Sequence, residues 1–181
     1  MALTKVIGSG IGTVTNQFAN TNMVAGSVVQ TVLVKQDVGT SAINTTNANF
    51  VSTALFAQIT PLATSSKILV SFSFAAYNTG ANAYVQATVF RGITSSTNAN
   101  TQIAGGTNLS GAGDDLTSYG MAMHFEQQLG VATLTSTALD SPSSTSQQTY
   151  TLAYSAHGNG GTAVFNVNDA YAYLMLQEIR G

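Results

Sequence analysis

Residues 67–77 read KILVSFSFAAY, and this stretch indicates the fold of the chain more clearly than any other. Its large apolar side chains fall at every second position, at Ile68, Val70, Phe72 and Phe74, with Ser71 and Ser73 between them. Because successive side chains of a β-strand point to opposite faces of a sheet, the alternation predicts a strand with one buried face. A helix would need an apolar stripe with a period of about 3.6 residues, and no segment holds one at length.

Strand-like segments of the same kind lie on both sides of this stretch. They cover residues 27–35, 50–59, 82–91, 120–128, 130–138, 148–157, 162–167 and 171–179. Turns rich in Gly, Asn and Ser separate them, and the run HGNGG at His157–Gly161 predicts a β-hairpin. About nine short strands in one unit predict an all-β fold, a single β-sandwich of jelly-roll type.

The chain of 181 residues has the size of one domain, which we place at residues 26–181. Residues 1–25 differ, because they hold only isolated apolar side chains such as Val6 and Phe18. Alone, such a segment cannot bury enough surface to offset its ordering entropy. We interpret it as an extended N-terminal assembly arm, and a frayed terminus or a first edge strand is the alternative. Two polar segments, residues 92–119 and 139–147, are predicted to be loops.

Charged residues make up only 7% of the chain, against about 25% in an ordinary soluble domain. Ser, Thr, Asn, Gln, Ala and Gly take their place. A surface of uncharged hydroxyls and amides gives little repulsion between copies, so it favours a place within an assembly. Hydrophobic residues reach 44%, which is enough for a full core, and the formal net charge is -2. The composition therefore points to an architectural protein rather than to an enzyme.

The composition also argues against several partners. The five Lys and Arg residues are scattered singly, whereas a nucleic-acid surface needs basic residues clustered on one face. No apolar run approaches the ~20 residues that cross a bilayer, so we expect no membrane partner. Residues 1–22 hold no apolar core of a signal peptide, and we expect synthesis in a host cytoplasm without export. With no cysteine, disulfides and thiolate sites are excluded.

Few residues could carry chemistry. His124 lies two positions from Glu126, and Asp114 and Asp115 are the plausible further ligands of a metal or acid–base site. A metal site needs about three or four converging ligands, so we favour an ordinary strand face at His124. The run GSGIG at Gly8–Gly12 lacks the Lys and the preceding strand of a phosphate-binding loop. We predict no catalytic, cofactor-binding or metal-ligating residue and no cofactor.

Tyrosines outnumber histidines seven to two, and they are better candidates for recognition. The seven tyrosines are Tyr77, Tyr84, Tyr119, Tyr150, Tyr154, Tyr171 and Tyr173. An apolar ring with a polar tip suits contacts to proteins or glycans. Tyrosine is equally a favoured strand residue, so both interpretations remain open at this point.

Four blocks of the sequence resemble a family of structural proteins of tailed bacteriophages. They are QITPLATSSKILVSFSFAAY (58–77), VFRG (89–92), LDSPSSTSQQTYTLAY (139–154) and AYLMLQEIRG (172–181). The most specific piece is Asp140-Ser141-Pro142 leading to Thr149-Tyr150, and the opening MALTKVIGSGIG (1–12) is similar to the start of small phage virion proteins. The resemblance covers about residues 55–180. In that family, similar blocks form jelly-roll-like domains of tail fibres and of head decoration or head-fibre proteins, commonly trimeric.

The resemblance implies a non-enzymatic phage virion protein. Its leading form is a trimeric decoration or cement protein on the capsid, with residues 1–25 as the anchor and the major capsid protein or another virion protein as partner. The alternative is a tail-fibre or receptor-binding module, whose loop 92–119 and exposed tyrosines contact a glycan or protein receptor on the host surface. Fibre versions usually end a long chain with a repetitive shaft, which tilts the expectation toward the decoration protein. Trimerisation is expected to bury the apolar faces of strands 67–77 and 171–179.

A glycan-cleaving enzyme on the same sandwich is the third hypothesis. It would require a carboxylate pair, such as Asp114 with Asp115 or with Glu126, held at the separation that glycosidases use. Adjacent Asp residues on a Gly-rich loop are more typical of a turn or of a Ca²⁺ contact, so we do not favour an enzyme.

Overall fold

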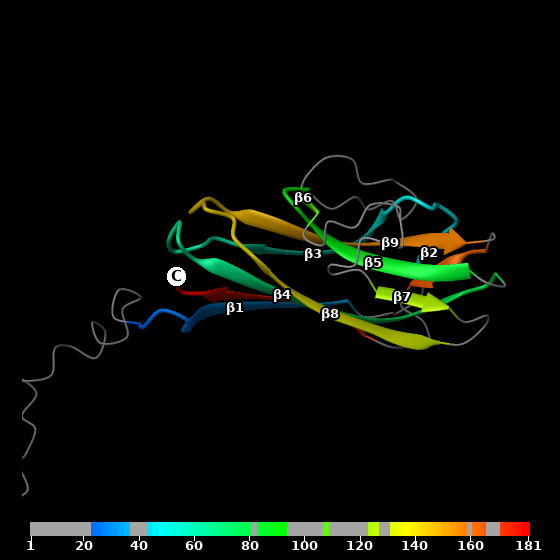
Figure 1. Cartoon of the computed structure of the whole chain (residues 1–181), viewed down its shortest axis with the longest axis horizontal. Helices are drawn as coiled ribbons and strands as arrows, with labels where there is room; N and C mark the ends of the chain where they lie inside the picture. Colours follow the sequence, from blue (N-terminus) through cyan, green and yellow to red (C-terminus); the bar gives the residue numbers. More distant parts are fainter. Residues whose placement is uncertain are drawn as a thin grey trace, which may run out of the picture.

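The computed structural model describes residues 23–36, 43–80, 83–93, 107–108, 123–126, 131–158, 161–165 and 171–181. Within these ranges every regular element is a β-strand, as the alternation of the sequence predicts. The strands form two antiparallel sheets that lie one above the other (Figure 1). The predicted all-β sandwich is therefore confirmed.

The first sheet contains six strands and the second sheet contains five. The first consists of β1 (Val28–Gln36), β2 (Ile43–Thr45), β4 (Lys67–Asn78), β8 (Ala132–Asp140), β10 (Ala163–Phe165) and β11 (Ala172–Ile179). The second consists of β3 (Val51–Ile59), β5 (Ala83–Arg91), β6 (Thr107–Asn108), β7 (Met123–Glu126) and β9 (Gln148–Gly158). The expected strands are all present with shifted ends, whereas the sequence patterns missed the short β2 and β6.

The strand pairings nest within one another along the sequence. β1 pairs with β11, β3 with β9, β4 with β8, and β5 with β7. Early strands thus pair with late strands, and successive pairs enter opposite sheets, which is the wrapping of a jelly roll. The pairings of β11 with β4 and of β9 with β5 then join these pairs into sheets. The predicted jelly-roll type is borne out by this order.

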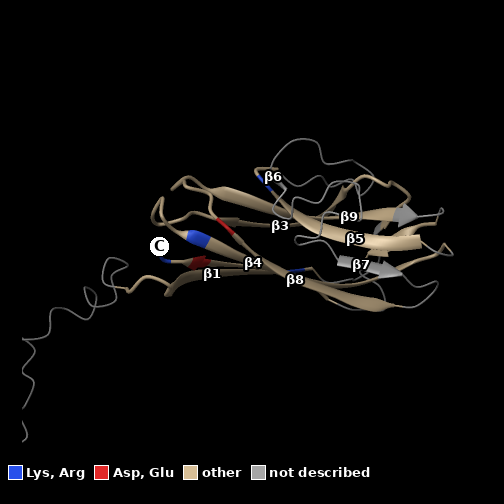
Figure 2. Cartoon of the chain, viewed as in Figure 1, with Lys and Arg blue, Asp and Glu red and all other residues tan. Residues whose placement is uncertain are grey.

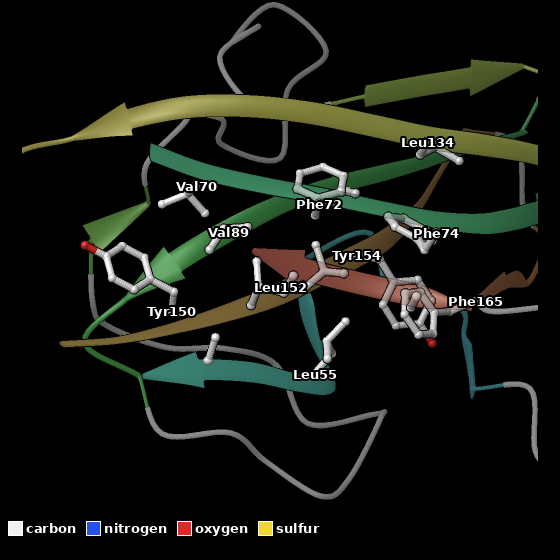
Figure 3. Packing of buried hydrophobic residues seen from close by; sticks show 14 of the residues in the cluster. Leu55, Val70, Phe72, Phe74, Val89, Leu134, Tyr150, Leu152, Tyr154 and Phe165 are labelled. Carbon is white, nitrogen blue, oxygen red and sulfur yellow. The ribbon is translucent and has the colours of Figure 1, made fainter. Parts of the chain in front are cut away.

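The core lies between the two sheets and takes the inward positions of both. Ile68, Val70, Phe72 and Phe74 of β4 are at most 2% exposed, in agreement with the alternation of KILVSFSF. Rings from both sheets meet there: the centroid of Phe165 lies 4.7 Å from that of Phe74 and 5.5 Å from that of Tyr154 (Figure 3). Burial of such aromatic side chains supplies most of the hydrophobic stabilisation of the sandwich.

This core corrects the expectation that trimerisation buries the apolar faces of strands 67–77 and 171–179. Those faces are already buried inside one chain, since Leu174 and Leu176 of β11 pack with Phe72 of β4 in a single core cluster. Any contact with another copy must use the opposite face of these strands or a sheet edge.

The predicted hairpin at His157–Gly161 is wrong. β9, before this run, belongs to the second sheet, while β10, after it, belongs to the first. The run therefore connects the two layers, and its glycine content has another cause at Gly161. Gly161 has a φ of +133°, and a Cβ there would collide with the side chain of Asn78 and the backbone of Gly80. Close approach of two chain segments demands glycine at this position.

Backbone hydrogen bonds join the start of the described chain to its C-terminal end. Gly26 N donates a hydrogen bond to Arg180 O at 2.8 Å, and Arg180 N donates to Ser27 O at 2.9 Å. The chain thus enters β1 beside the end of β11. The predicted assembly arm at residues 1–25 lies almost wholly outside the described residues, as do most of the loop 92–119 and Asp114 and Asp115.

Candidate assembly surfaces

The outer face of the first sheet is the broadest exposed surface built from described strands. We define it by the outward positions of β1, β11, β4 and β8, which the strand register aligns in rows. One row runs Leu33, Met175, Ser71, Thr137, and the next runs Lys35, Tyr173, Ser73, Thr135. A further row runs Thr31, Gln177, Leu69, Leu139. Lys35 is the only charged residue in these three rows.

Apolar and hydroxyl side chains share this outer face. Leu33 is 59% exposed and Leu139 is 54% exposed, at opposite sides of the sheet. Between them, hydroxyls pair across strands: Ser71 and Thr137 lie 3.0 Å apart, and Thr135 donates to Ser73 at 3.0 Å. A face of this kind can pack against another protein without desolvating charges.

A tyrosine pair lies at one end of this face. Tyr171 and Tyr173 are 47% and 37% exposed, and their ring centroids lie 6.3 Å apart in an edge-to-face arrangement. Lys35 Nζ lies 3.3 Å from the centroid of the Tyr171 ring, a cation–π contact. Among the tyrosines that the structure describes, these two are the exposed ones. Tyr150 and Tyr154 are instead buried in the core.

The outer face of the second sheet also carries threonine and serine side chains, but in the middle of that face they are buried rather than exposed. Thr88, Thr151 and Ser155 point away from the core, yet all three are fully buried. Thr151 Oγ1 donates to Ile93 O at 2.9 Å, and Ser155 Oγ donates to Gln86 Oε1 at 3.2 Å. The middle of this face, around these three residues, is closed, so the outer face of the first sheet is the better candidate for assembly.

Residues from two blocks of the sequence resemblance, 139–154 and 89–92, meet in one polar cluster between the sheets. Asp140, at the end of β8, accepts a hydrogen bond from Tyr150 OH of β9 at 2.8 Å. Arg91 Nε, from β5, lies 3.1 Å from the same Asp140 Oδ2. Burial and then this hydrogen bond raise the pKa of Tyr150 above its ordinary value, so the hydroxyl stays protonated and donates. The cluster clamps the first sheet to the second at one end of the sandwich.

A second buried carboxylate has a comparable structural role. Glu178 of β11 is fully buried and accepts hydrogen bonds from Leu62 N at 2.8 Å and from Gln30 Nε2. Gln30 Nε2 also donates to Thr60 O at 2.8 Å. These contacts tie the turn between β3 and β4 to the first sheet. Both carboxylates whose side chains the structure describes are thus engaged in contacts that hold the fold together.

Of the residues considered for a metal or acid–base site, the structure describes His124 and Glu126, which lie on one strand of the second sheet. His124 and Glu126 belong to β7, where they pair with Gln86 and Tyr84 of β5. Tyr84 also pairs with His157 of β9, so the register places Glu126 and His157 on either side of it. This neighbourhood follows only from strand order and was not visible in the sequence. Among the described residues, no three His, Asp or Glu side chains gather as a metal site would require.

Charge is sparse over the whole described surface. Figure 2 shows isolated blue and red positions on strands that are otherwise uncharged. Within the described ranges, no helix is long and apolar enough to cross a membrane.

The scan against protein-family models finds no match, and the search of the curated proteins finds none. Among solved structures, the chain is similar to the VP2 subviral particle of infectious bursal disease virus, with a TM-score of 0.45 and 8% identity over 86% of this chain and 34% of that one. It is similar to T=1 particles derived from the same virus, with a TM-score of 0.27 and 11% identity over 86% of this chain and 42% of that one. A CocE/NonD family hydrolase from Staphylococcus aureus follows, with a TM-score of 0.29 and 8% identity over 88% of this chain and 34% of that one. The chain spans about a third of the length of the VP2 chain and of the hydrolase chain.

Proposed function

We propose that this chain is a non-enzymatic structural protein of a bacteriophage particle, a trimeric decoration or cement subunit that binds the assembled capsid. Residues 1–25 anchor it to the major capsid protein or another virion protein. A subunit that binds only the assembled state stabilises that state by mass action, and no chemical step is needed.

One observation carries this proposal: the outer face of the first sheet is broad, exposed and almost without charge. Interface cores are depleted in charged residues, and this face meets that description with Leu33, Met175 and Leu139 among Ser and Thr. The sequence resemblance to phage virion proteins supports the virion as the place of assembly.

The described carboxylates also support a structural role, because both already accept hydrogen bonds within the fold. An acid–base mechanism needs carboxylates that reach a substrate, whereas Asp140 and Glu178 are occupied by hydrogen bonds within the fold. Their neighbours Tyr150, Gln30 and Leu62 hold them in place. These groups stabilise the scaffold on which a binding face is displayed.

Quantitative mass spectrometry of purified virions tests the proposal first. A copy number comparable to that of the major shell protein is expected. A much lower copy number that matches tail components would favour the fibre class, and absence from the particles would overturn the virion role.

Binding to shells that lack this protein tests the surface and the arm separately. The variant Leu33→Lys/Met175→Lys should lose shell binding while its free energy of unfolding changes by no more than about 0.5 kcal/mol per site. Gln58→Lys, at an exposed position on β3, is the matched control and should bind normally. Deletion of residues 1–25 should leave a folded trimer that no longer binds shells, and full binding by the deletion variant would contradict the role of the arm.

The exposed tyrosine pair favours a second candidate function, a tail-fibre or receptor-binding module that contacts a host surface glycan or protein. Aromatic rings stack on sugar rings, and Lys35 adds a positive charge beside Tyr171. Purified protein would then bind host cells and compete with infection, and Tyr171→Ala/Tyr173→Ala would abolish both effects. Absence of cell binding by the unaltered protein would exclude this function.

A further inference from the structure

Among the described strands, β8 forms an edge of the first sheet. In the described part of the chain it pairs with β4 alone, in an unbroken register from Ile68↔Asp140 to Ala76↔Ala132. Its sequence, ATLTSTALD, holds no Pro or Gly and only one charge, Asp140, which Arg91 and Tyr150 occupy. An edge strand exposes unpaired backbone N–H and C=O groups, and a long, flat, uncharged edge is a template for another chain.

The other two long edge strands carry the devices that proteins use to block such pairing. β1 has a register shift between Val28 and Gln30 and carries Lys35. β3 has a register shift between Ser52 and Phe56, where Ala54 adopts a φ of +62°. Bulges and charges of this kind disfavour strand addition. The contrast singles out β8, which has no bulge and no charged residue except Asp140.

The sequence of β8 is nearly symmetric about Ser136. In an antiparallel pair of two β8 strands centred there, Thr135 of each copy would stand opposite Thr137 of the other, and Leu134 opposite Ala138. Cross-strand Thr pairs are favourable, and the one charge, Asp140, would stand opposite Ala132. We propose that β8 is a self-association site at which a second copy of this chain adds its own β8 antiparallel, across a two-fold axis at Ser136.

This contact would join two first sheets into one continuous sheet that ends at β1 on both sides. A two-fold contact is closed because each edge is used by the other copy, so the pairing does not propagate into fibres. The proposal goes beyond the trimeric decoration role, because a three-fold contact must use another surface. If both contacts form, β8 links one trimer to the next.

Engineered cysteines test the register directly, since the chain contains no cysteine of its own. Directly opposite residues of an antiparallel pair have Cα atoms about 4.5–5.5 Å apart, within the about 4.4–6.8 Å range of disulfides. Ser136→Cys should therefore form a two-chain disulfide under mild oxidation. Thr135→Cys is the matched control: its copy lies two residues along the strand, more than about 7 Å away, so it should not cross-link. Equal cross-linking of both variants, or of neither, would overturn the proposal.

Charge substitutions test the same contact in the otherwise unaltered chain. Thr135→Lys/Thr137→Lys and Thr135→Glu/Thr137→Glu should each lose self-association in sedimentation, because like charges would face each other on both pairs. Mixing the lysine variant with the glutamate variant should restore association, as a heterodimer of the two. Gln58→Lys, at an exposed position on β3 of the second sheet, should associate as the unaltered chain does. An unaltered protein that sediments as a monomer, or as a trimer without higher even-numbered species, would overturn edge pairing and leave the decoration proposal standing.

Discussion

The outer faces of the two sheets both carry threonines in the middle of their strands, and these threonines differ in exposure. On the first sheet, Thr31, Thr135 and Thr137 are exposed, while on the second sheet Thr88 and Thr151 are fully buried. Strand alternation places all of these threonines on the side away from the core. Alternation thus reveals which side chains avoid the core, and it does not reveal which outward side chains meet solvent.

The largest expected difference in stability comes from placing a lysine on the outer face of each sheet in turn. Thr151→Lys should destabilise the protein by at least about 3 kcal/mol, because it buries an ammonium group with no partner. Thr31→Lys, an outward threonine of β1, should change the free energy of unfolding by less than about 0.5 kcal/mol. Urea unfolding of both variants measures the difference. Equal losses would mean that the two faces are not different environments.

The next effect compares the inner and outer positions of one strand. Glu178→Ala should cost about 3 kcal/mol, because Leu62 N and Gln30 Nε2 lose a charged acceptor. Gln177→Ala, the adjacent outward position of β11, should cost less than about 0.5 kcal/mol. Thermal unfolding of the pair distinguishes them, and a small effect at Glu178 would show that the turn at residues 60–62 is held by other contacts.

The stability of the protein at alkaline pH reports on Tyr150 and Tyr154, the buried tyrosines on the inward side of β9. Burial raises the pKa of Tyr150 and Tyr154 above the ordinary value of 10.0. Their contribution to stability is fully present below pH 10.0 and is lost as the pH rises, because only the unfolded chain then releases these protons. The loss amounts to about 1.4 kcal/mol per pH unit for each residue. Unfolding between about pH 9 and about pH 12 should show this slope, and Tyr150→Phe/Tyr154→Phe should remove most of it.

The smallest expected effect is the difference in stability between removing the hydroxyl of Tyr150 and removing that of Tyr154. Tyr150→Phe should cost about 1.5 kcal/mol, because the hydrogen bond to Asp140 is lost. Within the described structure the buried Tyr154 hydroxyl has no hydrogen-bond partner, so Tyr154→Phe should be neutral or slightly stabilising. Calorimetry of the two variants gives the comparison. A loss at Tyr154 equal to that at Tyr150 would reveal a partner for its hydroxyl.

The residues that carry the sequence resemblance prove to be residues that hold the fold. Asp140 and Tyr150, from one block, meet Arg91, from another, in one clamp, and Glu178 meets the turn after β3. These polar residues hold the architecture together, while function depends on the residues that the surface displays.

The sequence by itself determined the β-sandwich, its core and its low charge. Period-two alternation and composition are local properties, so KILVSFSF could identify its own buried face. Only the tertiary structure decided that the run at His157–Gly161 crosses between sheets, that Tyr84 stands between Glu126 and His157, and that outward threonines of the second sheet are buried. Each of these depends on which distant strands become neighbours, and strand pairing is set by long-range packing that no single segment encodes.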